Sequence, residues 1–422
     1  MSKDKTQGES RATLGESKDK TLGASPERTL GVLGGGQLGR MFVQAAQRLG
    51  FETVVFDPDA VSNGKLSPAA QVSEHYIQAD YLDTNSLKQL GDQCYAITTE
   101  FENVPADALA FLAEPARGVF VSPKAAAVRI AQDRVLEKAH FAASGVPTAP
   151  YCVIESEANI AAVPDDFYPA ILKTARMGYD GKGQVTVKSS PELLAAWRGL
   201  SGVVCVLEKR MALASECSVL LARQWDANGQ ECIVHWPVQT NVHVNGILAT
   251  TEVELRASTT QEIELIEAAK KIASDLDYQG VLCIEFFILA DGAWVVNEMA
   301  PRPHNSGHVT MDASSVSQFE AQVRVAARLP LVPPRQHSSV VMVNLLGDVW
   351  FNATSDESPR EPDWARVLAL GNDAVGVHLH LYGKHEARRA RKMGHINVTA
   401  QSLEVARSVA ARIQKQLGSD PN

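Results

Sequence analysis

The sequence predicts an α/β protein of several domains, and three observations carry this prediction. Strand and helix patterns alternate between residues 29 and 127, a ββαβ order follows at about 151–211, and long strand patterns surround one helix in 212–330. Alternating strands and helices are typical of a parallel sheet. We therefore expect an N-terminal parallel-sheet domain, a small lobe, a central antiparallel α+β domain and a small C-terminal domain within the 422 residues.

The composition is that of an ordinary globular protein, with 45% hydrophobic and 21% charged residues. A net charge of −9 argues against a nucleic-acid partner. No apolar stretch reaches the roughly 18 residues of a membrane span, and no secretory signal pattern is present. The six scattered cysteines form no CxxC pair and indicate reduced thiols in a cytoplasmic protein.

The expected boundaries follow from shifts in pattern. Residues 1–28 repeat SKDKT, contain few large apolar side chains and predict a disordered tail. The parallel-sheet domain is expected at 29–127, a linker helix with the small lobe at 128–211, the central domain at 212–333 and the C-terminal domain at 334–418. Single helices are expected over 128–150, ended by Gly145 and Pro147, and over 314–328.

The first strand–helix turn, GGGQLG at residues 34–39, satisfies the glycine spacing of a dinucleotide-binding loop. Asp57 ends the second strand about twenty residues later, where such folds bind a ribose hydroxyl. This pattern favours an NAD site. A phosphosugar fits the same turn equally well, because a helix N-terminus attracts any phosphate, and a tight turn without a ligand is the third alternative.

A second glycine-rich turn follows Lys173 in the sequence ILKTARMGYDGKGQVTV, residues 171–187. No Walker-type phosphate loop occurs in the chain. A lysine on a strand followed by Gly178, Gly181 and Gly183 can instead form a flap that closes over nucleotide phosphates. The alternative is a simple mobile hairpin.

A third motif, VLEKRMALASEC, spans residues 206–217. The apolar strand that leads into residues 208–211 offers backbone donors and acceptors to an adenine edge. Glu216 could accept hydrogen bonds from ribose hydroxyls. Charges at a strand end are also common without any ligand, so this motif is weak alone.

Two glutamates carry the most informative pattern. The runs VLCIEFFIL and AWVV are separated by residues 290–292, Ala-Asp-Gly, and predict a β-hairpin. Glu285 and Glu298 can then lie side by side across the hairpin, which is costly unless a cation sits between them. Mg²⁺ with nucleotide phosphates meets this need. A polar loop with Arg302 and His304 follows; the alternative is a surface hairpin with an ordinary loop.

A basic cluster near the C-terminus stands out in this acidic chain. It contains Lys384, Arg388, Arg389, Arg391 and Lys392. A solvated run of charges is one interpretation. Together with Arg302 and the GGGQLG turn, the cluster favours a phosphate-binding site.

Six sequence strings resemble those of the ATP-grasp superfamily and, within it, the N5-carboxyaminoimidazole ribonucleotide synthetases. These are GGGQLGRM (34–41), TTEFENVP (98–105), GYDGKGQ (178–184), QTNVHVNGIL (239–248), NEMAPRPHNSGH (297–308) and RKMGH (391–395). The resemblance runs from about residue 29 to 417. It implies an ATP-grasp fold behind a Rossmann-like domain. In the related formate-dependent glycinamide ribonucleotide transformylases, PRPH is not followed by NSGH, which argues against that family.

The resemblance implies that ATP and bicarbonate carboxylate 5-aminoimidazole ribonucleotide, with Mg²⁺ as cofactor and a homodimer as the assembly. It assigns the nucleotide site to Arg134, Lys173, Gly178, Tyr179, Asp180, Gly181, Lys182, Gly183, Gln184, Glu208, Lys209, Arg210, Met211, Glu216, His243, Asn297 and Glu298. It assigns the metal to Glu285 and Glu298, and the substrate to Gln37, Leu38, Glu100, Lys384, Arg391 and Lys392. The reacting groups would be faced by Lys173, Asp180, Arg302 and His304, with Glu102 as a further candidate.

Two other functions stay open on the sequence. An NAD-dependent dehydrogenase rests on GGGQLG and Asp57, and it leaves the flap and the paired glutamates without a role. An inactive ATP-grasp scaffold, with the tail as an interaction module, is the second. The basic cluster contains Arg388 and Arg389 between Lys384 and Arg391, a longer loop than the resemblance expects.

Overall fold

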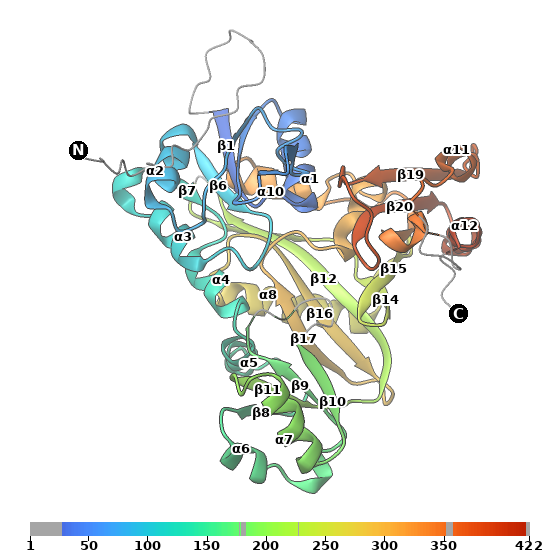
Figure 1. Ribbon diagram of the computed structural model, residues 1–422. Helices are drawn as coiled ribbons and strands as arrows, with labels where there is room; N and C mark the ends of the chain where they lie inside the picture. The colour runs from blue at the N-terminus through green and yellow to red at the C-terminus, as the bar shows by residue number, and fades with distance from the viewer. Residues whose placement is uncertain (1–27, 177, 179–182, 227, 352–357, 419–422) are drawn as a thin grey trace, which may run out of the picture.

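The structure, a computed structural model, describes residues 28–176, 178, 183–226, 228–351 and 358–418. Figure 1 shows three parts around a long central sheet: the N-terminal sheet in blue, a small lobe in green and the C-terminal strands in red. The predicted tail, residues 1–28, lies outside the described residues apart from Arg28.

The N-terminal part is a five-stranded parallel sheet in the order β5-β2-β1-β6-β7, as the alternating pattern predicted. All five residues of the central strand β1 are buried, which explains its unbroken apolar run. The elements are β1 (Thr29–Leu33), α1 (Gln37–Arg48), β2 (Glu52–Phe56), β3 (Val61–Ser62), β4 (Lys65–Leu66), β5 (His75–Ile77), α2 (Thr84–Gln93), β6 (Ala96–Thr99), α3 (Ala106–Leu112) and β7 (Phe120–Val121).

The predicted single helix over residues 128–150 is wrong, because two helices occupy this region. They are α4 (Ala125–Ala131) and α5 (Arg134–Ala143). Asp133 separates them: its carboxylate accepts hydrogen bonds from the backbone N–H groups at positions 135 and 136, and so starts a new helix. Gln132 ends the first helix, and its side chain bonds to backbone carbonyls of residues 102 and 104.

The small lobe is an antiparallel sheet in the order β10-β9-β11-β8, and its ββαβ order is confirmed. Strands β9 and β10 pair with Lys173 opposite Gln184, so they flank the glycine-rich turn, of which residues 177 and 179–182 lie outside the described residues. The elements are β8 (Tyr151–Ile154), α6 (Glu157–Ala161), β9 (Ala170–Thr174), β10 (Gln184–Val187), α7 (Ser190–Gly199) and β11 (Cys205–Lys209).

The strands after β11 form one nine-stranded sheet. Strand β15 pairs with β18 in this sheet, so the C-terminal strands continue the central sheet. The predicted helix over 314–328 is shorter, because Ser317 caps its start. The elements are β12 (Leu213–Trp225), β13 (Glu231–His235), β14 (Gln239–Val244), β15 (Ile247–Val253), α8 (Thr260–Asp275), β16 (Gly280–Leu289), β17 (Trp294–Ala300), α9 (Thr310–Ala313), α10 (Gln318–Ala326), β18 (Ser339–Leu346), α11 (Trp364–Leu368), β19 (Val375–Leu381), β20 (Lys392–Ala400) and α12 (Leu403–Leu417).

Helix α10 fixes the N-terminal sheet against the central sheet. Val323 and Ala326 join the core beneath β1, whereas Ala321 and Val325 join the core behind β12 and β16. Helix α8 covers the opposite face of the same central strands, where the alternate side chains of β12 and β16 pack against it. Because α10 packs in both of these cores, the carboxyl edge of the parallel sheet lies over the β16–β17 hairpin, which carries Glu285 and Glu298. In the described part of the chain, no helix combines the length and apolar character needed to cross a bilayer.

Candidate active site

One large cavity, about 1650 Å³ in volume, lies where the N-terminal sheet, the small lobe, the central sheet and the C-terminal strands meet. Every described residue that the sequence assigned to the nucleotide, metal or substrate contributes to its lining. Four flap residues of that set lie outside the described residues. These are Tyr179, Asp180, Gly181 and Lys182.

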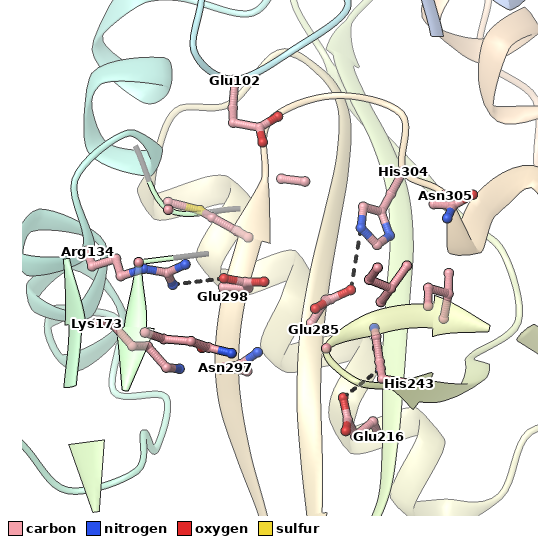
Figure 2. Close-up of a pocket in the computed structure, with 18 of the residues that line it drawn as sticks. Glu102, Arg134, Lys173, Glu216, His243, Glu285, Asn297, Glu298, His304 and Asn305 are labelled. Carbon is pink, nitrogen blue, oxygen red and sulfur yellow. Dashed lines mark hydrogen bonds and ion pairs between the residues drawn. The ribbon is translucent and has the colours of Figure 1, made fainter. Parts of the chain in front are cut away.

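The hairpin forms as predicted and sets its two glutamates side by side. Strands β16 and β17 are antiparallel, with Glu285 directly opposite Glu298. The turn contains Gly292 at φ +87°, a backbone conformation that glycine adopts without strain. Next to Glu285 the pairing shifts by a bulge. Figure 2 shows both carboxylates turned into the cavity.

The two carboxylates have opposite electrostatic surroundings. Burial, followed by the neighbouring Glu298 charge, raises the pKa of Glu285 to about 7. Burial also pushes the pKa of Glu298 upward, but Arg134 and Lys173 outweigh it and hold that pKa well below the ordinary value. Arg134 Nη1 donates to Glu298 Oε2 at 2.8 Å, as Figure 2 shows. Near neutral pH, Glu285 can therefore release its proton when a cation binds between the two carboxylates.

The residues around this pair fit a hard divalent cation. Asn297 Oδ1 is buried and has no hydrogen-bond partner among the described residues, and with the two glutamates it makes an all-oxygen donor set of the kind that Mg²⁺ takes. Within the described residues no group of three or more His, Cys, Asp or Glu side chains could hold a metal. Two carboxylates suffice for Mg²⁺, because phosphate oxygens and water complete its octahedron.

The polar loop after β17 is tied down by its own hydrogen bonds. Arg302 forms a partly buried ion pair with Glu102 from the N-terminal domain. His304 Nδ1 lies 2.9 Å from Ser306 Oγ, and its Nε2 lies 3.5 Å from Glu285 Oε1. Burial, followed by the Arg302 charge, lowers the pKa of His304 well below its ordinary value. His304 is therefore a neutral imidazole beside the carboxylate pair.

The glycine turn holds a protein carboxylate at the start of α1. The backbone N–H groups of Gly36 and Gly39 donate to the two oxygens of Glu100, at 2.6 and 2.8 Å. A Cβ atom on Gly34 or Gly36 would lie within 2.4 Å of the Glu100 side chain. These glycines thus make room for Glu100, which occupies the position that a dinucleotide phosphate would need. Gln37 and Leu38 remain on the cavity wall.

Asp57 is also engaged in the turn itself. Its carboxylate accepts hydrogen bonds from the Gly35 N–H at 2.6 Å and from the Tyr81 hydroxyl at 2.8 Å. Both of these bonds end on Oδ2, and Oδ1 accepts from the Asp59 backbone N–H at 2.6 Å, so each oxygen of Asp57 is already engaged within the protein. This arrangement argues against the interpretation of GGGQLG and Asp57 as an NAD site.

Lys173 meets the hinge strand through an ion pair, because Lys173 Nζ donates to Glu208 Oε2 at 2.8 Å. The Glu208 side chain is thus turned inward, and any contact to an adenine edge falls to the backbone of residues 208–211. Across the cavity, His243 Nδ1 lies 2.9 Å from Glu216 Oε2. Burial lowers the pKa of His243, but the Glu216 contact outweighs it and raises that pKa overall.

The basic cluster lines the cavity at the end opposite the small lobe. Lys384 Nζ donates to the Lys392 carbonyl at 2.6 Å, which closes the loop on itself. Arg391 donates to the Glu386 carbonyl, and its own carbonyl accepts from the Gly347 backbone N–H. Arg388 and Arg389 lie on the same wall, so the longer loop still delivers its charges to the cavity.

Sequence reasoning missed two residues of α5. Glu137 and Lys138 are buried, although glutamate and lysine rarely are. Glu137 Oε1 accepts from the Met299 N–H at 2.7 Å, and Lys138 Nζ donates to the Asn297 carbonyl at 2.9 Å. Their spacing from Arg134, three and four positions, was the available signal.

Known proteins resemble the chain over nearly its whole length. Three domain families match in order: a ribonucleotide synthetase pre-ATP-grasp domain at residues 27–132, an ATP-grasp domain at 139–319, and a phosphoribosylaminoimidazole carboxylase C-terminal domain at 340–409. The N5-carboxyaminoimidazole ribonucleotide synthase of Brucella melitensis is 42% identical over 87% of this chain and 94% of that protein. The chain belongs to the N5-carboxyaminoimidazole ribonucleotide synthase family.

Solved structures of this synthase family share the fold. An ADP complex of one synthetase matches with a TM-score of 0.80 and 35% identity, over 92% of this chain and 97% of that chain. The Aspergillus clavatus synthase, in complex with ADP and 5-aminoimidazole ribonucleotide, matches with a TM-score of 0.78 and 28% identity. The match covers 93% of this chain and 98% of that chain. The expected ATP-grasp fold and the expected class of enzyme, a ligase, are confirmed, and the dehydrogenase alternative is wrong.

Proposed function

We propose that this chain carboxylates 5-aminoimidazole ribonucleotide with bicarbonate in purine biosynthesis, and that the reaction converts ATP to ADP and phosphate. The observation that carries the proposal is the register of Glu285 against Glu298, inside the cavity that also receives Lys173 and the basic cluster. Membership in the synthase family supports the choice of substrates.

In the first step, a bicarbonate oxygen attacks the γ-phosphorus of ATP and ADP leaves, which gives carboxyphosphate. Bicarbonate alone is a poor electrophile, whereas carboxyphosphate carries a good leaving group. Glu285 and Glu298, with Asn297, would hold Mg²⁺, which neutralises charge on the transferred phosphoryl group. Lys173 and the flap residues Gly178–Gln184 hold the phosphates from the small-lobe side.

In the second step, the amine nitrogen of the substrate attacks the carboxyl carbon and phosphate leaves. Arg302 and His304 face this step, and Asp180 joins them from the flap by resemblance. Because His304 is neutral, its ring can accept the proton that the amine loses. Lys384, Arg391 and Lys392, with Gln37 and Leu38, hold the ribose phosphate. The flap must exclude water, since carboxyphosphate is short-lived there.

The finer assignments are part of the same proposal: Mg²⁺ as the cofactor, a homodimer as the assembly and the cytoplasm as the location. The domain boundaries given above also stay predictions. Sedimentation analysis of the purified chain tests the assembly, with a dimer as the expected species and a monomer at micromolar concentration as the contrary one.

Phosphate release from ATP tests the function. Aminoimidazole ribonucleotide with bicarbonate should stimulate release, whereas glycinamide ribonucleotide with formate should not. The carboxylated product should appear in equal amount to ADP. Stimulation only by glycinamide ribonucleotide with formate would overturn the proposal.

A further inference from the structure

Lys138 is a fully buried lysine outside the wall of the cavity. Its side chain is 0% exposed, and it does not belong to the residues that line the cavity. Lys138 Nζ lies 3.2 Å from Glu208 Oε1 and donates to the Asn297 carbonyl at 2.9 Å. A buried ammonium group is costly unless it is paired and hydrogen-bonded, so these two contacts account for its position.

Glu208 is shared between two lysines. Its Oε2 accepts from Lys173 Nζ at 2.8 Å, while its Oε1 faces Lys138. Two ammonium groups therefore meet one carboxylate, which leaves one net positive charge on the group. Of the two lysines, only Lys173 lines the cavity. Without Lys138, Glu208 would neutralise Lys173 by itself, and the attraction of Lys173 for an anion would fall.

Helix α5 reinforces this link to the metal-binding strand. Arg134, Glu137 and Lys138 lie on one face of the helix and contact three consecutive residues of β17, at positions 297–299. The Arg134 backbone N–H also donates to the Ala175 carbonyl, just after β9. One helix face thus fixes the glutamate-bearing strand and the lysine-bearing strand relative to each other.

We propose that Lys138 is a positioning residue that shares Glu208 with Lys173, so that Lys173 keeps its positive charge for the phosphates of the nucleotide. The proposal rests on the proposed function only in taking ATP as the ligand. Lys138 touches neither the nucleotide nor the substrate. It acts through Glu208 on Lys173, and through the Asn297 carbonyl on the strand that carries Glu298.

A series of nucleotides with increasing numbers of phosphates tests this role by calorimetry on the full chain. In Lys138→Met, the dissociation constants of ADP and ATP should rise roughly tenfold or more, because a charge-assisted contact is weakened. Adenosine should bind as it does to the unchanged protein. Equal weakening for adenosine, ADP and ATP would indicate a merely structural role and overturn the proposal, as would no weakening at all.

Lys124→Met is the matched control, because Lys124 also pairs with an acidic residue, Asp277, but lies half-exposed and away from the cavity. Its nucleotide affinities should not change. The assay uses neither bicarbonate nor the aminoimidazole substrate. A failure of the proposed reaction would therefore leave these binding results intact, and the two failures can be told apart.

A second pair of variants keeps the proposal testable if Lys138→Met does not fold. In Glu208→Gln and in the double variant Lys138→Met/Glu208→Gln, no carboxylate competes for Lys173. The dissociation constants of these two variants for ADP should agree within about threefold, because without the Glu208 carboxylate there is no negative charge for Lys138 and Lys173 to share. A double variant that binds ADP tenfold more weakly than Glu208→Gln would contradict the proposal.

Discussion

Glu100 and the pair Glu285 and Glu298 all line this cavity, and their carboxylate oxygens have different partners. Glu100 has both oxygens occupied by backbone N–H groups of the glycine turn, at 2.6 and 2.8 Å. Glu285 instead faces another carboxylate, Glu298, and its closest described partner is the neutral His304 at 3.5 Å. Glu100 completes a turn, whereas Glu285 and Glu298 repel each other across the hairpin, which a bound cation would relieve.

The difference separates structural from functional acid groups within one site. A carboxylate held by two backbone donors stabilises the fold, and only its remaining lone pairs are left for a ligand such as the substrate. A pair whose pKa values are pushed apart stores unfavourable energy that a bound cation releases. We therefore expect the glycine turn to respond to mutation in stability and the hairpin to respond in activity.

Removing the hairpin carboxylate should have the largest effect. Glu298→Ala should lower the rate of phosphate release by about a thousandfold, because metal and phosphoryl charge lose a direct partner. The folded state should persist, with an unchanged circular dichroism spectrum. Glu267→Ala, at an exposed glutamate paired with Lys270, serves as the control. Turnover of Glu298→Ala equal to that of the control would remove the metal assignment.

Amide substitutions at the two sites should change stability in opposite directions. Glu100→Gln leaves a glycine-turn N–H without its acceptor and should cost about 1–3 kcal/mol of unfolding free energy. Glu285→Gln removes a like-charge contact and should be at least as stable as the unchanged protein at pH 8. Urea unfolding measures both. A loss at Glu285 as large as that at Glu100 would erase the distinction between the sites.

Nucleotide binding with Mg²⁺ should depend on pH through Glu285. Because its pKa is raised to about 7, the group holds a proton below pH 7, and the cation must displace it. Affinity should therefore fall about tenfold per pH unit below 7 and level off above. Because folding raises the pKa of Glu285, the folded protein binds more protons than the unfolded chain between about pH 4.5 and 7. The contribution of Glu285 to the free energy of unfolding therefore decreases as the pH rises through this range.

Calorimetry in buffers of different ionisation enthalpy counts the released proton. Glu285→Gln has no such proton to release, so its affinity for the nucleotide with Mg²⁺ should not change with pH over the same range. A pH dependence that survives in Glu285→Gln would have to come from another group.

Glycine substitutions should also separate the two sites, and the one in the hairpin turn should have the smallest effect of all. Gly36→Ala places a Cβ 2.4 Å from Glu100 Oε1 and should destabilise by about 1–3 kcal/mol. Gly292→Ala, in the hairpin turn, meets nothing within 4 Å and carries only the strain of φ +87°, about 1 kcal/mol. Thermal unfolding measures both, and equal losses would contradict the close packing at the glycine turn.

The hairpin could be predicted well, because two apolar runs flank the turn residues Ala290-Asp291-Gly292, and a short turn sets which residues of the two strands pair. The same reasoning failed at the glycine turn. Spacing alone shows that a helix begins there, but not that Glu100, some sixty residues later, fills its N-terminus. It also failed at Asp133, whose capping bond splits a continuous helical pattern. Contacts between segments far apart in sequence leave no local pattern, and Glu100 is the clearest case.

A crystal structure with Mg²⁺ and a non-hydrolysable ATP analogue tests the central contrast most directly. The account predicts a six-coordinate cation with Glu285 and Glu298 oxygens at about 2.0–2.1 Å, while Glu100 keeps its hydrogen bonds to Gly36 and Gly39. A cation or phosphate seated on the glycine turn, with Glu100 displaced and the hairpin carboxylates uncoordinated, would contradict it.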